Sequence, residues 1–300
     1  MPTILTTNTP KAMWPGILEW WGTSYNDWEK EFVHLYEIVT STKNYEEDVQ
    51  VIGLGLAPEL SENDPVAYDT VMQGYTTRYT PKLYGIAYSI SKIAQKDNLY
   101  MEQVLPKTRN LARTMNKTRE YIAALPYNRA FDGTYTFGDG VALCVITHPT
   151  MAGNQSNVLN PAADFSQASL EDVLIQIADM KDDRGIKIHA KPLSLHGPTA
   201  LLYEFQRVLN SELQSNTAEN AINVVKGTFP RGYFINHEFD DTDAWFIRTD
   251  VTPGMKCVNR QDPEFEDAGD FETGARKYKS TMRIAFGCSD WRGIVASPGA

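Results

Sequence analysis

The sequence has few cysteines and no long apolar run. Its three cysteines, at positions 144, 257 and 288, are odd in number and lack the paired spacing of a disulfide framework or a zinc site. We therefore expect buried, reduced thiols. Apolar runs such as Val141–Ile146 are far shorter than the ~20 residues that cross a bilayer. The polar Met1–Pro10 also lacks the apolar stretch of a secretory signal, so we expect no membrane partner and folding in a cytoplasm.

Positive charge is also scarce. The chain has 28 Lys and Arg against 38 Asp and Glu, which gives a formal net charge of -10. Such a chain repels a polyanion and carries no overall basic footprint for phosphates. Sequence-specific nucleic-acid binding is therefore not expected.

Catalytic and metal-binding motifs are missing as well. Gly53 and Gly55 begin a glycine-rich loop, but Pro58 stands where a third glycine belongs, and no GKS or GKT follows. No G-x-S-x-G turn occurs. None of the 5 histidines pair at i, i+4, and the acidic runs 237–243 and 262–270 lack the pattern of a calcium loop. We predict no catalytic residue, no cofactor and no metal.

Two helical patterns occupy the first half of the chain. Apolar residues from Trp28 to Tyr36 recur at helical spacing, which predicts a helix over Ser24–Val39 after an irregular aromatic segment. A longer helix is predicted over Leu99–Leu125, with a kink or a late start at Pro106. At 100° per residue it has one apolar face and one basic face. The apolar face comprises Val104, Leu111, Met115 and Ile122, and the basic face comprises Arg109, Arg113 and Lys117.

Between these helices, side chains alternate with a period of two from Tyr45 to Ile93, which predicts strands. Residues 57–65 contain two prolines and three acids, which indicates a turn or a flexible tip. A long two-stranded projection is expected. Such a hairpin is only marginally stable unless something else packs on it.

The second half alternates helices and strands, which predicts a compact α/β unit within an α+β chain. Expected helices begin at Ser169, ending near Gly185, and at Pro198. Expected strands cover Val141–Thr147, Ile186–Leu195, Tyr233–Ile235, Ala244–Thr249 and the last stretch around Phe271–Ala275 and Met282–Cys288.

This order of elements resembles the major capsid protein of tailed bacteriophages, the Hong Kong 97-like fold. Residues 154–164, 170–182, 193–212 and 223–227 look like the axial domain of Mu-like head subunits. Asp243–Phe246, Phe286–Gly287 and Asp290–Gly293 are similar to the closing strands of such proteins. The likeness extends over nearly the whole chain.

The resemblance implies an N-terminal arm (1–43), an extended β-hairpin loop (44–93), a peripheral domain with a long spine helix (94–150), an axial domain (151–258) and returning peripheral strands (259–300). It further implies a non-enzymatic subunit that assembles with itself, as hexamers and pentamers, into an icosahedral shell around phage DNA. Implied partners are a scaffolding protein, a portal, decoration proteins and non-specifically packaged DNA. The expected location is the virion, assembled in the bacterial cytoplasm. The net negative charge suits a wall that must not adhere to packed DNA.

Two departures from relatives refine the expectation. Some relatives fuse a scaffolding segment to the N-terminus, whereas here the arm begins early, which implies a separate scaffolding protein or prior removal of that segment. Other relatives cross-link the extended loop through a lysine. Residues 46–81 contain no lysine, so covalent cross-linking of that kind is not expected.

Subunit contacts are expected at two places. The acidic tip, Glu59, Glu62 and Asp64, is predicted to lie over Arg109, Arg113 and Lys117 of a neighbouring subunit, with simple solvation of both as the alternative. Trp14, Trp20 and Trp21 are predicted to be buried between subunits, with a role in the subunit's own core as the alternative. Other functions left open are an encapsulin-like nanocompartment shell and a soluble α/β enzyme or binding protein.

Overall fold

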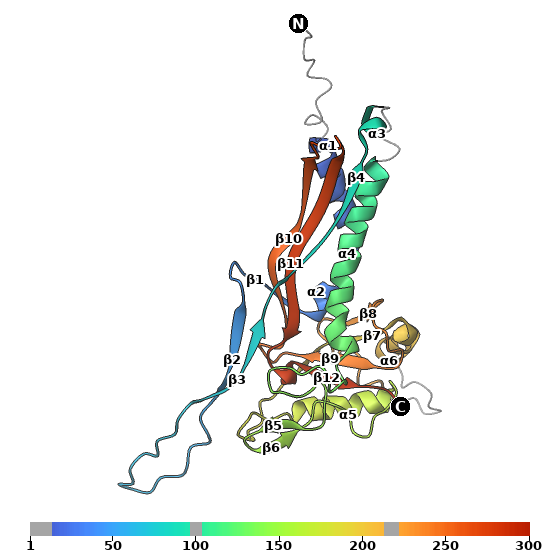
Figure 1. Ribbon diagram of the computed structural model, residues 1–300. Coiled ribbons are helices and arrows are strands. Elements are labelled where there is room, and N and C mark those ends of the chain that lie inside the picture. Colours follow the sequence, from blue (N-terminus) through green and yellow to red (C-terminus); the bar gives the residue numbers. More distant parts are fainter. Residues whose placement is uncertain (1–13, 97–103, 213–221) are drawn as a thin grey trace.

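The computed structural model describes residues 14–96, 104–212 and 222–300. Figure 1 shows an elongated molecule in which a long helix and a sheet of long strands rise above a compact base, while a thin hairpin projects away from both. Among the described residues, no helix is long and apolar enough to cross a membrane.

A sheet of long strands, here called the long sheet, forms the upper part. Its order is β1 (Glu37–Thr40), β10 (Met255–Gly269), β11 (Arg276–Cys288) and β4 (Lys82–Ile90). β1 runs parallel to β10, and the other pairs are antiparallel. Helices α4 (Leu105–Asn128) and α1 (Trp14–Asn26) pack on this sheet and on each other. Leu111 and Met115 of α4 meet Tyr278 and Met282 of β11 in one buried cluster, which attaches the helix to the sheet.

A second sheet, here called the compact sheet, forms the base. Its order is β12 (Ile294–Ser297), β9 (Trp245–Thr249), β7 (Pro192–Pro198) and β8 (Tyr233–Asn236). Successive strand residues face opposite sides, so Trp245 and Phe246 enter different cores. Trp245 packs with residues of α5 (Gln167–Ala178), the 3-10 turn Thr199–Leu201 and α6 (Leu202–Asn210). The smaller elements are α3 (Lys92–Lys96), β5 (His148–Thr150), β6 (Gly153–Gln155) and the 3-10 turn Trp291–Gly293.

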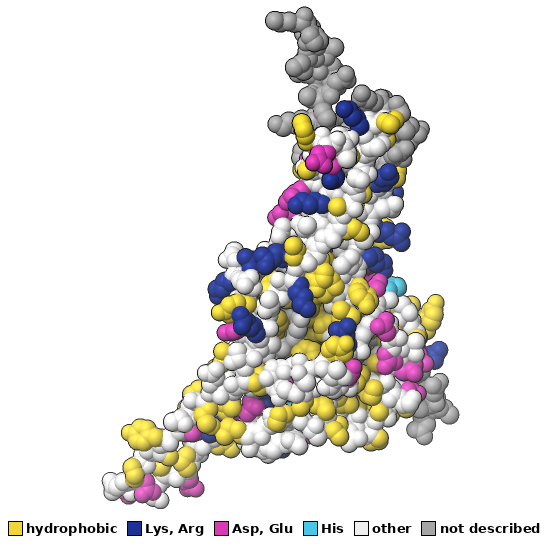
Figure 2. Space-filling model, in the orientation of Figure 1, with side chains coloured by type: hydrophobic (Ala, Val, Ile, Leu, Met, Phe, Trp, Pro, Cys, Tyr) yellow, Lys and Arg dark blue, Asp and Glu magenta, His cyan; other side chains and the backbone are white. Residues whose placement is uncertain are grey.

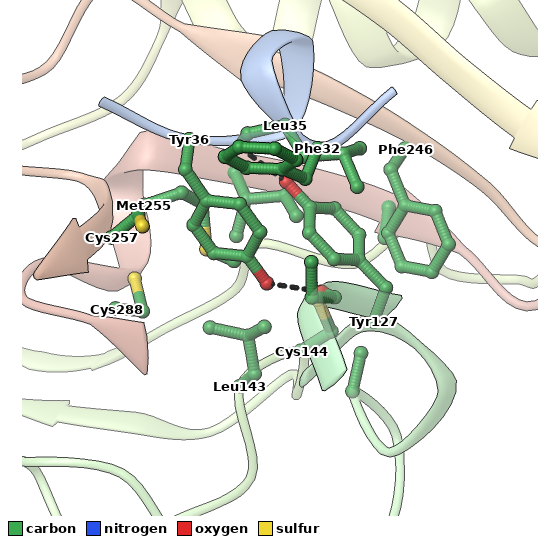
Figure 3. Packing of buried hydrophobic residues seen from close by; sticks show 14 of the residues in the cluster. Phe32, Leu35, Tyr36, Tyr127, Leu143, Cys144, Phe246, Met255, Cys257 and Cys288 are labelled. Carbon is green, nitrogen blue, oxygen red and sulfur yellow. Dashed lines mark hydrogen bonds between the residues drawn. The ribbon is translucent and has the colours of Figure 1, made fainter. Parts of the chain in front are cut away.

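A junction core joins the two sheets (Figure 3). Tyr36 of the arm donates a hydrogen bond to the Ala123 carbonyl of α4 at 2.6 Å, and Tyr127 of α4 donates one to the Leu35 carbonyl at 2.9 Å. This reciprocal exchange ties the arm to the helix while both rings remain buried. The expected free thiols are confirmed, because Cys144, Cys257 and Cys288 are all buried without disulfides. The cluster also includes Phe32, Leu143, Phe246 and Met255.

The arm differs from its predicted form. Helix α1 covers the segment that was expected to be irregular, and a short helix, α2 (Phe32–Leu35), is followed directly by β1. The predicted helix over Ser24–Val39 is therefore wrong. The reason is tertiary, since Glu37–Thr40 find a strand partner in β10 that local helical spacing does not reveal.

The projection is a hairpin of β2 (Glu46–Ile52) and β3 (Met72–Tyr79), paired antiparallel. It is shorter than the predicted span 44–93, because β4 pairs with β11 along its whole length and so belongs to the long sheet. The chain between β2 and β3, residues 53–71, contains no helix or strand.

Helix α4 agrees with the prediction in its late start and its two faces. Pro106 lies in the first turn, where its missing N–H costs no helical hydrogen bond. Leu111 and Met115 are buried, whereas Arg109, Arg113 and Lys117 are exposed. The first predicted residues of this helix, 99–103, lie outside the described residues.

Several predicted elements of the second half shift. Val141–Thr147 is a partly buried turn rather than a strand, because the Asn157 amide and the Ala130 carbonyl satisfy its backbone. The strand expected at Ile186–Leu195 is β7, six residues later at its start, whereas β8 and β9 lie where they were predicted. Phe271–Ala275 is a turn between β10 and β11, and β12 joins the compact sheet instead of the long one.

Candidate subunit-contact surfaces

The hairpin tip exposes apolar side chains that its own chain does not cover. Leu56 is 81% exposed and Tyr68 is 99% exposed. Figure 2 shows hydrophobic and acidic side chains together at this end of the molecule. A concentration of exposed apolar groups marks an interaction surface. The exposed apolar residues of this region are Val51, Leu54, Leu56, Leu60, Val66, Tyr68 and Val71.

An ion pair holds the base of the tip. Arg184, in the loop after α5, donates to both carboxylate oxygens of Asp69, at 2.8 and 3.3 Å, and to the Thr70 carbonyl at 2.9 Å. The amide of Gly55 donates to the same Asp69 carboxylate at 2.8 Å. This backbone hydrogen bond, followed by that of Thr70 and the charge of Arg184, lowers the pKa of Asp69. The two sides of the loop are thus joined to each other and to the base.

The root of the hairpin is held against the long sheet. Lys256 of β10 pairs with Asp48 of β2 at 2.7 Å, and the Ser289 hydroxyl donates to the same carboxylate at 2.6 Å. Tyr79 of β3 is buried and lies 2.6 Å from the Ser289 hydroxyl. With its root and the base of its tip both anchored, the hairpin leaves the body in a set direction.

The acids of the tip point into solvent. Glu59, Glu62 and Asp64 are all exposed. Asp64 accepts a hydrogen bond from the Ser61 amide at 2.9 Å and so closes the turn at the end of the loop. Glu59 and Glu62 form no ion pair with any residue that the structure describes. Their charges therefore remain available to another molecule.

The basic face of α4 borders a shallow groove of about 540 Å3. Two of its three cations already have partners within the chain, since Lys117 pairs with Glu238 at 2.6 Å and the Arg113 guanidinium lies 5.0 Å from the Trp28 ring centroid. The acidic run 237–243 thus serves in part to hold α4. The groove is lined by Asn110, Arg113, Thr114, Lys117, Thr118, Tyr121 and Glu238.

A larger groove, of about 640 Å3, lies at the other end of α4 and was not foreseen. Its apolar lining includes Tyr84, Leu125 and Tyr135, and its basic residues include Lys82 and Arg129. In Figure 2, hydrophobic side chains gather at mid-height between the long sheet and α4. These residues come from segments far apart in the sequence. No local sequence pattern indicates the groove, because β4, α4 and β11 each contribute only part of its lining.

The three tryptophans of α1 do not share one environment. Trp21 is buried and stacks on Tyr25 at 5.3 Å and on Phe265 of β10 at 5.7 Å, so its own chain covers it. The predicted burial of Trp21 between subunits is thus replaced by a place in the core. Trp20 is 40% exposed and stays a candidate contact. The side chain of Trp14 lies outside the described residues.

Comparisons with known proteins bear on the whole arrangement. No family model matches the sequence, and no curated protein matches it. Solved structures do. The virus-like particle from Pyrococcus furiosus is 11% identical, with a TM-score of 0.57, over 94% of this chain and 98% of that one. The capsid of Myoviridae phage XM1 is 13% identical, with a TM-score of 0.55, over 88% and 90%.

The capsid of an empty GTA particle is 12% identical, with a TM-score of 0.55, over 90% of each chain. This chain has the Hong Kong 97-like capsid fold. The predicted α+β class and the resemblance on which it rested are therefore confirmed. At these identities the likeness establishes the fold alone.

Within this capsid fold, the described residues include no group of three or more His, Cys, Asp or Glu side chains that could hold a metal ion. A buried His–Asp pair lies in the described interior, and no sequence motif indicated it. His148 lies 2.5 Å from Asp139 and 2.9 Å from Asn157, and its ring stacks on Trp291 at 4.3 Å. His148 is fully buried. The pair therefore ties β5 to the turn that contains Asp139 in the interior of the subunit.

Proposed function

We propose that this chain is a major capsid protein that assembles with copies of itself into the icosahedral shell of a tailed phage. The observation that carries the proposal is the hairpin tip, which extends from a capsid fold with exposed apolar and acidic side chains that the described chain leaves uncovered. A surface of that kind gains free energy only by contact with another molecule. The chain acts by assembly rather than by catalysis.

Repetition would give such a shell its stability. Apolar contacts contribute about 25 cal/mol per Å2 of surface removed from water, so a modest contact repeated around every subunit sums to a large total. The anchors at Asp48 and Asp69 hold the hairpin in place before it meets a neighbour. Such preorganisation lowers the entropic cost of association.

We propose that the acidic tip, Glu59, Glu62 and Asp64, lies over the basic face of α4 in a neighbouring subunit, at Arg109, Arg113 and Lys117. Opposite charge and the groove beside Arg113 and Lys117 support this pairing. Exposed ion pairs contribute only about 0–1 kcal/mol each, so they would set register and salt sensitivity more than affinity. Because Lys117 already contacts Glu238, the tip would share this cation rather than capture a free one.

Charge reversal tests the pairing. Arg113→Glu with Lys117→Glu should slow assembly, measured by light scattering, while Arg207→Glu on α6 is the matched control. Particles that form at the normal rate would reject this acceptor. Lys82→Glu with Arg129→Glu probes the larger groove in the same assay, since that groove also offers basic and apolar groups.

Other contacts and partners are proposed from the capsid fold. We propose that residues 1–43 correspond to the N-arm, the hairpin within 44–93 to the extended loop, 94–150 with α4 to the spine-helix region, and 151–258 to the axial domain. Residues 259–300 would be the returning strands, apart from β12, which belongs to the compact sheet. Trp20, and Trp14 six residues before it, would contact a neighbouring subunit. A scaffolding protein, a portal, decoration proteins and non-specifically packaged DNA are the proposed partners, with assembly in the bacterial host cytoplasm and a final place in the virion.

Particle size tests the function directly. The purified chain should give hexamers, pentamers or megadalton particles on a sizing column and closed shells by negative-stain microscopy. Elution at the monomer mass of 33.7 kDa under all conditions would contradict assembly.

A nanocompartment shell is the second candidate, because the virus-like particle from Pyrococcus furiosus shares the fold over 94% of this chain. Particle contents separate the two functions. Nuclease-protected DNA inside particles from infected or induced cells supports the phage head, whereas a packaged enzyme without DNA supports the nanocompartment.

A further inference from the structure

A third cavity, of about 390 Å3, lies between the arm and the compact sheet, away from the hairpin tip. Arm residues Val33 to Ile38 form one wall, and β9 with the loop that follows it forms another. Two arginines line it, Arg248 of β9 and Arg231 before β8. None of the proposed subunit contacts uses this cavity.

Arg248 is buried without a counter-ion. Its side chain extends from the same side of β9 as Phe246, and Nη1 donates to the His34 carbonyl at 2.6 Å. Within residues 14–96, 104–212 and 222–300, no carboxylate lies within 4.0 Å of this guanidinium. The other buried arginines differ, since Arg292 pairs with Asp183 and Asp290, and Arg119 lies 3.6 Å from Asp262. Burying an uncompensated cation is costly, so a ligand is expected to compensate for it.

Arg231 adds a second positive charge at the exposed side of the same cavity. Glu37 is the one carboxylate in the described lining, and it forms an ion pair with neither arginine. The two arginines also act on a nearby histidine. Burial first, and then the charges of Arg231 and Arg248, lower the pKa of His34, while Glu29 and Glu31 oppose them. Burial and Arg248 likewise lower the pKa of His196.

We propose that this cavity binds a phosphate-type oxyanion between Arg248 and Arg231. Guanidinium groups present planar, paired N–H donors that match phosphate oxygens, and a charge-assisted bond of this kind is about twice as strong as a neutral one. The volume exceeds that of a single tetrahedral ion, so a phosphate carried by a nucleic acid also fits the chemistry. Bound there, the anion would stabilise the arm against the compact sheet, because Arg248 already bonds the arm at His34.

Direct binding of inorganic phosphate tests the site on the full chain. Titration calorimetry at pH 7.5, with sodium chloride adjusted to constant ionic strength, should show saturable binding to the wild-type protein. Arg231→Gln should raise the apparent Kd about tenfold or more, because one charged hydrogen-bond partner is lost. Arg207→Gln, an exposed arginine on α6, is the control and should bind as the wild type does.

Two comparisons make the outcome decisive. Arg248→Gln should abolish phosphate binding, but it also removes the hydrogen bond to the His34 carbonyl. If Arg248→Gln fails to fold, the exposed Arg231→Gln tests the proposal instead. A short single-stranded oligonucleotide that competes with phosphate, and loses affinity in Arg231→Gln, identifies a nucleic-acid phosphate as a source. Competition by inorganic phosphate alone identifies the free ion. No saturable phosphate binding, or equal binding by Arg231→Gln and wild type, overturns the proposal.

Discussion

The body of the molecule and the hairpin tip differ in how much of their apolar side chains they bury. In the body, Tyr127 and Trp245 are buried, and Tyr127 has a hydrogen-bond partner. In the tip, Leu56 and Tyr68 stand almost fully in solvent. Removal of apolar surface from water is favourable wherever that surface lies. The isolated chain leaves the apolar side chains of the tip in water, so their burial would stabilise a contact with another molecule. The contrast distinguishes a region that packs on its own chain from a region that we propose is covered by another molecule.

The boundary between the two regions is narrow. Asp69 and Gly55 close the base of the tip, and Arg184 attaches it to the body. On the body side, β2 and β3 pair from Glu46 with Tyr79 to Ile52 with Met72, with one register shift between Val49 and Val51, whereas residues 53–71 have no strand partner. A change beyond this boundary should thus affect assembly, and a change behind it should affect folding.

Removing the tip should have the largest effect. Replacing residues 57–67 with a short Gly-Ser linker, while Gly55 and Asp69 remain, should abolish particle formation by light scattering and microscopy. The free energy of unfolding of the subunit should change by less than about 0.5 kcal/mol, because these side chains are exposed. Normal particles from this variant would show that the tip has no role in contacts between subunits.

The reverse pattern is expected in the body. Trp245→Ala should lower the free energy of unfolding by about 3–5 kcal/mol in a urea titration, because a fully buried indole leaves a cavity. Tyr68→Ala, at a 99% exposed aromatic residue, is the matched variant and should leave the urea midpoint unchanged. Equal losses in both variants would show that Tyr68 packs within its own subunit.

Local sequence patterns predicted the elements whose burial follows directly from the spacing of their own apolar and polar residues. The two faces of α4 follow from helical spacing, and the exposed acidic tip follows from the prolines and acids of 57–65. β8 and β9 were placed by their short apolar runs. In each case the pattern and the packing have the same period.

Elements that depend on distant partners were not predictable in this way. Tyr36 has the spacing of a helix, yet the next residues pair with β10, more than two hundred residues away. The side chains of β4 alternate as expected for a strand of the hairpin, but β4 pairs with β11 and therefore belongs to the long sheet. Arg248 was missed because a charged residue in a strand indicates an exposed position. Its burial results from the arm, which covers that face of β9 only in the folded chain.

Acidity should stabilise the fold, because protonation removes a charge that is buried where the arm meets α4. Burial raises the pKa of Glu120 to about 7, from a usual 4.5, although the Phe32 amide donates to its carboxylate at 2.8 Å. The folded state then binds the proton more tightly than the unfolded state. The free energy of unfolding should therefore fall as pH rises from 4.5 to 7, by about 3 kcal/mol, and level off above pH 7.

Urea titrations of unassembled subunits across this pH range measure the effect. Glu120→Gln removes the ionisable group, so its contribution to the change of unfolding free energy with pH should vanish. The exposed Glu204→Gln should keep the wild-type pH dependence. A wild-type slope in Glu120→Gln would assign the pH dependence to another group.

The smallest effect is expected at the boundary itself. Arg184→Gln removes the pair to Asp69 and the bond to the Thr70 carbonyl, but these groups lie near the surface, so global unfolding should not change measurably. Hydrogen exchange should instead quicken at the Gly55 amide, whose acceptor Asp69 loses its anchor. Lys187→Gln, which removes a surface pair to Asp179 in the body, is the control and should leave Gly55 unaffected. If Gly55 stays protected in Arg184→Gln, the loop closes on itself, and the direction of the tip is set at the Asp48 root instead.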